Sequence, residues 1–325
     1  MAKKTSHSKL PASHSQSQAT RDGFGEGLLL AARRDPRVIA LSADLTESLR
    51  MDKFLTEFPD RFIQLGVHEQ LLAALAAGLA LENKIPFIGS FAVFSPGRNW
   101  EQIRTNICLN RANVKIVGSH AGVTVGPDGA THQMLEDIAL MRALPRMTVI
   151  APADAEEARR ATLAAAEWDG PVYLRLGRSK VAPVTDSEKP FKIGQADTLR
   201  PGKDVAIVAC GLMVGEALKA AEMLAAQKIS AQVINLHTIK PLDAKTLLAA
   251  AKKCGAVVTA EEHQLAGGLG SAVAELLAEK LPVPIEMVGV RDAYGQSGEA
   301  EELLAHYGLT AKEIAKAAKK ALSRK

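Results

Sequence analysis

Residues 61–90 read RFIQLGVHEQLLAALAAGLALENKIPFIGS, and they give the clearest indication of the fold class. Residues 61–65 and 85–90 are short apolar runs with β-branched side chains, which is typical of strands. Between them lies an apolar helix that starts near Glu69 and includes residues 71–81. A strand, a helix and a second strand in this order are typical of a parallel sheet that helices cover.

The same alternation continues on both sides of this stretch. Further strands are expected at residues 38–42, 114–119, 148–151 and 172–176. Helices are expected after Thr20, which is a suitable N-cap, over residues 98–111, and after Asp154, whose carboxylate can cap the first free amides.

The pattern lapses between residues 177 and 203, where prolines and scattered charges indicate a linker. A second series follows, with strands expected at residues 205–209, 231–236, 256–260 and 285–290. We therefore predict an α/β protein of two consecutive parallel-sheet α/β sandwich domains, residues 19–180 and residues 203–325. Residues 181–202 are the expected linker, and residues 1–18 are expected to form a disordered tail.

Composition and charge exclude several classes of protein. The 325 residues are 47% hydrophobic and 23% charged, as in a soluble globular protein of enzyme size. The net charge is +4, and Lys3, Lys4 and Lys9 in the tail supply most of it, so no clustered basic face for nucleic acid is predicted. The longest uncharged apolar run, residues 71–81, is too short for a bilayer, which needs about 20 residues. Neither nucleic acid nor a membrane is an expected partner.

The cysteines and the N-terminus indicate the compartment. Residues 1–18 contain no hydrophobic signal core. Cys108, Cys210 and Cys254 are far apart in the sequence and form no CxxC pair, which argues against a zinc site or a disulfide framework. The sequence therefore predicts a cytoplasmic protein with reduced, structural cysteines.

Two glycine-rich stretches, residues 122–129 and 267–270, could suggest a nucleotide site. A P-loop ends in Gly-Lys-Ser/Thr, and a dinucleotide fingerprint reads G-x-G-x-x-G, and neither pattern is present. We expect residues 267–270 to form a tight turn between a strand and a helix.

Five polar side chains stand at expected strand or helix ends or in the loops beside them. Glu69 opens a helix that is apolar all round, so its carboxylate is expected to be buried, where it pairs, caps or does chemistry. His120 and His132 bracket a glycine loop with Asp128 between them, which suggests either hydroxyl recognition or two histidines facing solvent. His263 follows Glu261 and Glu262 at a strand end, and a structural role is expected for it.

A set of short motifs resembles the thiamine-diphosphate enzymes of the transketolase family. They are Ser42-Ala-Asp44, Gly66-Val-His-Glu69-Gln, Gly89-Ser-Phe91-Ala-Val-Phe94, Ser119-His120 and Gly126-Pro-Asp128-Gly-Ala-Thr-His132, in the family's order and spacing. The resemblance covers about residues 19–320 and implies a pyrimidine-binding domain followed by a transketolase C-terminal domain. It also implies thiamine diphosphate as cofactor, and transfer of a two-carbon ketol unit from a ketose phosphate to an aldose phosphate.

The resemblance assigns cofactor-binding roles to four residues. Glu69 matches the glutamate that binds the aminopyrimidine ring nitrogen and promotes the imino tautomer, whose nitrogen then removes the thiazolium proton. Phe94 and Phe91 match an aromatic pair beside that ring, although ordinary core packing is their alternative role. Asp44 matches an aspartate near the subunit interface and the cofactor, or else caps the turn after its strand.

The resemblance also implies a substrate site. His120, Asp128 and His132 would contact the hydroxyls and carbonyl of a ketose, with both histidines and Glu69 as catalytic residues. The sugar-phosphate positions of the family fall on Arg21, Ser48 and Arg178, where a guanidinium can engage two phosphate oxygens.

One part of a full-length transketolase is missing from this sequence. Full-length members carry a Gly-Asp-Gly motif that helps to hold magnesium and diphosphate, and this chain has no such triplet. The chain therefore resembles the C-terminal subunit of a split transketolase, and an N-terminal subunit is expected to supply the Mg²⁺ ligands in an α₂β₂ heterotetramer. Gly97 stands where many transketolases have a tyrosine, so the wall on the thiazolium side is expected to differ.

Three alternatives stay open. A subunit resembling deoxyxylulose-phosphate synthase shares several motifs, but that family usually has Asp-Arg in place of Ser119-His120. The beta subunits of 2-oxoacid dehydrogenases share the domain pair but differ around Thr131-His132-Gln133. A catalytically silent scaffold subunit would be expected to lack Glu69 or the loop histidines, and all are present.

Overall fold

The structure is a computed structural model of the chain, and it describes residues 16–325. Its first sheet has seven strands in the order β12-β6-β7-β5-β4-β2-β3. All neighbours are parallel except β12, which pairs antiparallel with β6 at one edge. The strands are β2 (Val38–Ser42), β3 (Phe62–Gln64), β4 (Ile85–Phe91), β5 (Lys115–Ser119), β6 (Thr148–Ile150), β7 (Val172–Arg175) and β12 (Thr238–Lys240).

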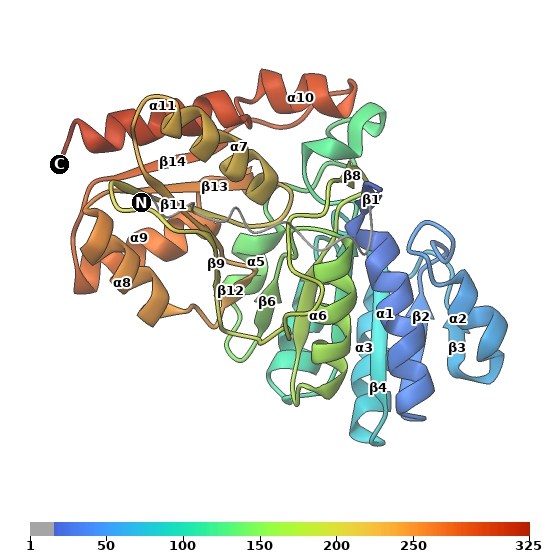
Figure 1. Cartoon of the computed structure of the whole chain (residues 1–325). Coiled ribbons are helices and arrows are strands. Elements are labelled where there is room, and N and C mark those ends of the chain that lie inside the picture. The colour runs from blue at the N-terminus through green and yellow to red at the C-terminus, as the bar shows by residue number, and fades with distance from the viewer. Residues whose placement is uncertain (1–15) are drawn as a thin grey trace.

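Helices cover both faces of this sheet (Figure 1). One face packs against α1 (Thr20–Arg34) and α6 (Ala155–Glu167), which lie side by side, and the other packs against α3 (Glu69–Leu81). In β2, Val38 and Ala40 face the first layer, and Ile39 and Leu41 face the second. Burial of both faces explains why these strands are continuous apolar runs. The remaining helical segments of this part are α2 (Asp52–Glu57), η1 (Pro59–Arg61), α4 (Trp100–Gln102), η2 (Ile103–Cys108), η3 (Val123–Asp128) and α5 (Asp137–Ala143).

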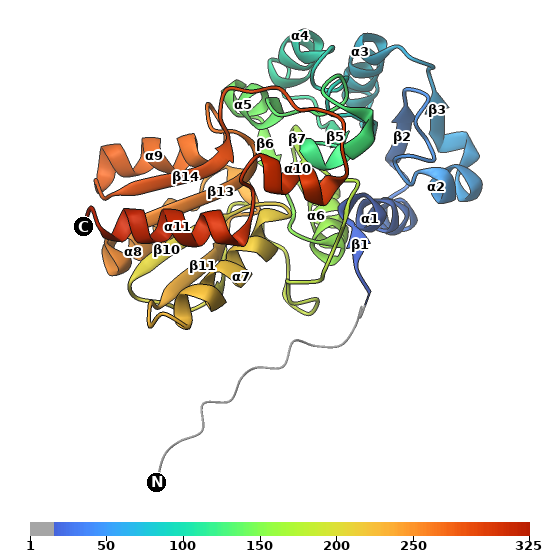
Figure 2. The same ribbon diagram turned by 90° about the horizontal axis from the view of Figure 1, so that it is seen from above.

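The second sheet has five strands in the order β14-β13-β10-β11-β9. They are β9 (Asp197–Arg200), β10 (Val205–Ala209), β11 (Ala231–Asn235), β13 (Val257–Gln264) and β14 (Ile285–Val290). Both faces carry helices (Figures 1 and 2), namely α7 (Met213–Ala225), α8 (Ala244–Cys254), α9 (Leu269–Lys280) and α11 (Ala311–Leu322). In contrast, α10 (Ala300–His306) packs against η3 of the first unit. The prediction of two consecutive α/β domains built on parallel sheets is confirmed.

The two units are tied together more closely than the pattern indicated. Within the expected linker, β9 joins the second sheet as an antiparallel edge strand next to β11. Strand β12, from the second half of the sequence, completes the edge of the first sheet. Of the expected tail, residues 1–15 lie outside the described residues, and Gln18 forms part of β1 (Gln18–Ala19), which pairs with β8 (Lys180–Val181).

Three local expectations can be compared with the structure. Asp154 caps α6 as predicted, because its Oδ1 accepts from the amide of Glu157 at 2.8 Å. The prediction for Thr20 is wrong: Ala19 is the N-cap, and the Thr20 hydroxyl instead accepts from the amide of Gly177 at 2.7 Å. Residues 98–111 form only one short α-helical turn, α4, which continues as the π-helical segment η2.

The cysteines are free and buried, and burial raises the pKa of the Cys108 thiol to about 11. No helix within residues 16–325 is both long enough and apolar enough to cross a bilayer.

A glycine allows the close contact between α1 and α6, and this contact can be tested. A Cβ at Gly23 would lie 1.8 Å from the carbonyl oxygen of Ala155, which cannot move away without shifting α6. Gly23→Ala should therefore lower the free energy of unfolding by about 2 kcal/mol or more. Gly215→Ala is the matched control, because a Cβ there meets nothing within 4 Å, and it should raise stability by roughly 0.5 kcal/mol. Urea denaturation measures both, and equal effects would contradict the close contact.

Candidate active site

Most of the predicted site residues lie where parallel strands of the first sheet end. Ser48 follows β2, Glu69 follows β3, Phe94 follows β4, and His120 comes directly after β5. In a parallel sheet these carboxyl ends share one edge, where α/β proteins bind ligands.

Glu69 is the first residue of α3 and is 2% exposed. Its Oε2 accepts a hydrogen bond from Arg98 Nη1 at 3.1 Å, and its backbone carbonyl accepts from Asn99 Nδ2 at 2.9 Å. The carboxylate thus pairs with Arg98 and does not cap its own helix. Among the described residues, Arg98 is its hydrogen-bond partner, which leaves Oε1 available to a further donor.

Aromatic rings connect Glu69 to the loop histidines. The Arg98 guanidinium lies over the Phe94 ring, 5.2 Å from its centroid. Phe94 and Phe91 are stacked with centroids 6.3 Å apart, and His132 approaches the Phe94 ring edge-on at 5.6 Å. Both phenylalanines are only partly buried, so ring surface is accessible to a ligand.

His120 is buried and neutral. Its ring stacks on Phe91 at 3.9 Å, its Nδ1 lies 3.0 Å from Ser119 Oγ, and its Nε2 lies 3.2 Å from Arg21 Nη1. Because a guanidinium can only donate, Nε2 is the acceptor and the proton sits on Nδ1. Burial, followed by the nearby guanidinium groups of Arg21 and Arg178, lowers the pKa of His120 to about 3. The alternative of a histidine facing solvent is wrong for His120, which is 3% exposed.

Of the three residues that the resemblance assigns to sugar-phosphate binding, Arg21 and Arg178 lie near His120 and Ser48 contacts Arg21. Arg21 Nη1 donates to the carbonyl of Ser48 at 2.9 Å, and its buried Nε has no hydrogen-bond partner among residues 16–325. Arg178 Nη1 donates to the carbonyl of Val125 at 3.0 Å and lies 3.4 Å from Asp128 Oδ1. Burial, followed by the charge of Arg50, lowers the pKa of Arg21. Such a cluster of guanidinium groups suits an anion.

The glycine loop carries the remaining substrate candidates. Asp128 is exposed at the end of η3 and pairs with Arg178. His132 is partly buried, and its Nδ1 lies 2.9 Å from Thr131 Oγ1.

Two positions differ from the others. Asp44 is exposed, its backbone adopts a left-handed φ of 61°, and its amide donates to Gln64 Oε1 at 2.8 Å. Within residues 16–325 it forms no hydrogen bond or ion pair with the Glu69–His120 group. At Gly97 a Cβ would lie 1.9 Å from the carbonyl oxygen of Val93, so this backbone excludes the tyrosine that many family members have.

Sequence reasoning missed two contributors. Arg98 pairs with Glu69, although no local pattern identifies it. The only available signal was that a buried carboxylate requires a cationic or hydrogen-bonding partner. Glu262 lies in β13 and accepts from the amide of Thr124 at 2.7 Å, so the second domain reaches the glycine loop.

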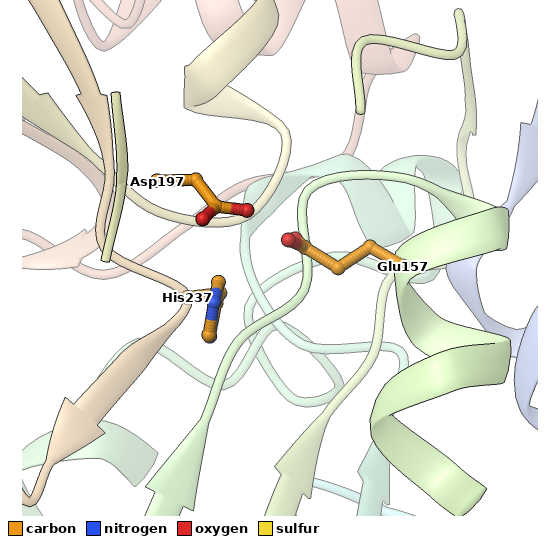
Figure 3. Close-up of side chains that lie close together, drawn as sticks. All are labelled: Glu157, Asp197 and His237. Carbon is orange, nitrogen blue, oxygen red and sulfur yellow. The ribbon is translucent and has the colours of Figure 1, made fainter. Parts of the chain in front are cut away.

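A separate cluster of Glu157, Asp197 and His237 lies between the two units (Figure 3), with potential ligand atoms within 4.8 Å of one another. Its members already have partners. Glu157 accepts from the amide of Ala153 at 2.7 Å and from Asn235 Nδ2 at 2.8 Å. Asp197 pairs with Lys189, and His237 Nδ1 lies 2.9 Å from Thr238 Oγ1. Burial raises the pKa of Glu157 to about 7. Of these bonds, the one between Glu157 and Asn235 joins the two units, so the cluster forms part of the contact between them.

Comparison with known proteins identifies the family. The profile of the transketolase pyrimidine-binding domain matches residues 16–183, and that of the transketolase C-terminal domain matches residues 194–314. The chain belongs to the transketolase family. The predicted resemblance to the C-terminal subunit of a split transketolase is confirmed by the similarity to a solved split-gene transketolase structure.

Three similar proteins show how this transketolase-family chain relates to split and full-length members. A solved structure described as "Split gene transketolase, inactive beta4 tetramer" superposes with a TM-score of 0.89 at 47% identity, covering 94% of this chain and 99% of that one. The 6-deoxy-6-sulfo-D-fructose transketolase subunit SqwH of Clostridium sp. (strain MSTE9) is 45% identical over 94% of this chain and 95% of its own length. The 1-deoxy-D-xylulose-5-phosphate synthase of Heliobacterium modesticaldum is 38% identical, and the match covers 91% of this chain but only 46% of the synthase.

The neutral state of His120 predicts a pH response. Its pKa of about 3 in the folded chain lies below the value of about 6.5 in unfolded chains, so the unfolded state binds the extra proton between these limits. The free energy of unfolding should therefore rise with pH from about 3 to 6.5, and His120→Gln should remove part of this rise. In NMR spectra the imidazole C2 proton of His120 should not shift between pH 8 and pH 5, whereas free histidine does. A midpoint near pH 6.5 would contradict the assignment.

Proposed function

We propose that this chain supplies the pyrimidine-binding half of a thiamine-diphosphate-dependent transketolase. The reaction moves a two-carbon ketol unit from a ketose phosphate to an aldose phosphate. The observation that supports this most directly is the buried Glu69 carboxylate at the head of α3, whose Arg98 partner lies over the Phe94 ring. The same edge of the sheet carries a neutral His120 beside two guanidinium groups.

The residues around Glu69 fit an aminopyrimidine ring. The Arg98 bond occupies Oε2, so Oε1 can share a proton with a ring nitrogen, and the partly exposed Phe94 offers an apolar surface to a flat ring. When bound, thiamine diphosphate supplies a carbon nucleophile and an electron sink. The role of Glu69 is to hold or release the proton at the ring nitrogen, and burial keeps water away from that exchange.

On the substrate side, His120 and His132 are placed to exchange hydrogen bonds or protons with sugar hydroxyls and the carbonyl, together with Asp128. Arg21, Ser48 and Arg178 form the anionic end of the site. A sulfonated ketose is a second candidate donor, because the relative from Clostridium is named for 6-deoxy-6-sulfo-D-fructose and a sulfonate also suits paired guanidinium groups. A deoxyxylulose-phosphate-synthase-like reaction remains the alternative, given the similarity to that enzyme.

A partner subunit is part of the proposal. Val67 and Leu71 flank Glu69 and are 62% and 51% exposed, which leaves an apolar surface beside the buried glutamate. An N-terminal transketolase subunit would cover this surface and supply the Mg²⁺ and diphosphate ligands, since the sequence lacks Gly-Asp-Gly. The proposed assembly is an α₂β₂ heterotetramer.

The test of the function is reconstitution with the N-terminal partner. The complex should transfer ketol units in the presence of thiamine diphosphate and Mg²⁺, whereas the isolated chain should be inactive.

Glu69→Gln keeps the size of the side chain but loses the proton exchange, so turnover should fall roughly 10²- to 10⁴-fold at saturating cofactor. Steady-state kinetics measure this. Near wild-type turnover in a Glu69→Gln complex that assembles normally would exclude the role, and turnover of pyruvate with glyceraldehyde phosphate would favour the synthase alternative.

Arg178 tests whether the donor carries a phosphate. Loss of a charge-assisted contact remote from the reacting carbon should raise KM most, with kcat/KM down about 30- to 150-fold for a phosphorylated ketose. The unphosphorylated analogue should be nearly unaffected by Arg178→Ala. Lys180→Ala is the matched control, because this lysine is exposed two residues further along the chain. Equal losses for the two ketoses would show that Arg178 does not bind a phosphate.

A further inference from the structure

The loop of residues 122–134 carries Asp128 and His132, but neither nucleotide binding nor the proposed chemistry explains its glycines. The structure shows that its glycines face the second domain. A Cβ at Gly122 would lie 2.2 Å from the Glu262 carboxylate, and a Cβ at Gly129 would lie 2.6 Å from Ser297 Oγ. Both glycines have positive φ, of 89° and 76°. On the surface of the second domain, a Cβ at Gly295 would lie 1.6 Å from Oε1 of Gln133 in the loop. Glycine is thus needed on both surfaces for the second domain to approach the loop.

Two sets of hydrogen bonds hold the loop where it meets the second domain. At its start, Glu262 Oε1 accepts from the Thr124 amide at 2.7 Å across a sequence separation of 138 residues. At its end, Gln133 Nε2 donates to the carbonyl of Gln296 at 2.9 Å. The same amide group donates to the carbonyls of Val123 and Gly126 within the loop, both at 3.1 Å.

Glu262 is itself fixed by the first domain. Arg175 of β7 donates from Nη2 to the Glu262 carbonyl at 2.7 Å and from Nε to Asp137 Oδ2 at 2.8 Å. Glu262 is 4% exposed, and Arg175 is 8% exposed. A buried carboxylate at the junction of two domains has little freedom to move, so the bond to Thr124 fixes the start of the loop.

We propose that Glu262 is a positioning residue for the active site. By anchoring the loop that carries Asp128 and His132, it makes the second domain set the geometry of the substrate side. The link to substrate rests on the proposed function, because that function gives Asp128 and His132 their contact with the ketose. The anchoring itself depends only on the bonds described.

The neighbouring Glu261 provides a matched control. It is fully buried in the same strand, but its carboxylate accepts from the amides of Leu269 at 2.6 Å and Gly270 at 2.8 Å, at the start of α9. Burial raises the pKa of both carboxyls to about 7. Both side chains are therefore buried in the same strand, but Glu261 binds the start of α9 and Glu262 binds the start of the loop.

The first experiment is hydrogen exchange on the chain itself. Glu262→Ala should speed exchange in residues 122–134 at least tenfold, and Glu262→Gln should restore protection because the amide oxygen still accepts from Thr124. Glu261→Ala should leave this loop unchanged and speed exchange at the start of α9 instead. If Glu262→Ala does not fold, Gln133→Ala removes the bond at the other end of the loop and should also speed its exchange. Unchanged loop exchange in the folded variants, or equal loop effects of the alanine substitutions at 261 and 262, would overturn the proposal.

The second experiment uses the assembled complex. Glu262→Ala should raise KM for the ketose and lower kcat/KM about 10- to 100-fold, because the substrate groups lose their placement. The half-saturating concentration of thiamine diphosphate should stay within about twofold, and so should all kinetic constants of Glu261→Ala. Faster loop exchange with unchanged ketose KM would overturn the positioning role while leaving the ketol-transfer function intact. If the wild-type complex transfers no ketol unit, the proposed function fails, and hydrogen exchange still decides whether Glu262 anchors the loop.

Discussion

Burial of both faces of the first sheet is the constraint on which the rest of the structure depends. Parallel strands need crossover connections, and here these connections place α6 on one face and α3 on the other, while α1, which precedes β2, packs beside α6. The carboxyl end of each parallel strand therefore lies at the same edge of the sheet, and so does the loop that follows each strand. Arg21, in the first turn of α1, and His120, directly after β5, meet at this edge although they are 99 positions apart in the sequence.

Periodicity was sufficient to predict the sheet and the burial of Glu69, because both follow from local composition. The strands that are apolar on both faces and the helix with no polar face can be read without knowing their neighbours. The exceptions depend on tertiary contacts. β9 and β12 are three- to four-residue edge strands whose pairing partners lie elsewhere in the sequence, and Thr20 bonds Gly177 across the domain. The partner of Glu69 was not predictable for the same reason, since Arg98 is 29 positions away and on another element.

The site residues were also predictable only in part. A resemblance in motif order placed Glu69, Phe94, His120 and Arg178 along one edge, but it contained no information about protonation. The neutral state of His120 comes from its burial and from guanidinium groups on two other segments, Arg21 in the first turn of α1 and Arg178 after β7. Likewise, the glycines of residues 122–129 matched no nucleotide-binding pattern in the sequence. Their cause is the approach of Glu262 and Ser297 from the second domain, which no local pattern contains.

The same edge also carries polar groups that are incompletely satisfied. Among the described residues, the buried atoms without a hydrogen-bond partner include Arg21 Nε and Asn99 Oδ1, which lie beside His120 and Glu69 respectively. Each such atom costs about 1–3 kcal/mol, and a fold selected for stability alone would pair or remove it. The packing of helices on the two sheets stabilises the fold and offsets the cost of these unpaired atoms. A polar ligand seated at this edge would recover part of that cost, which links the incomplete bonding of the free chain to its capacity to bind.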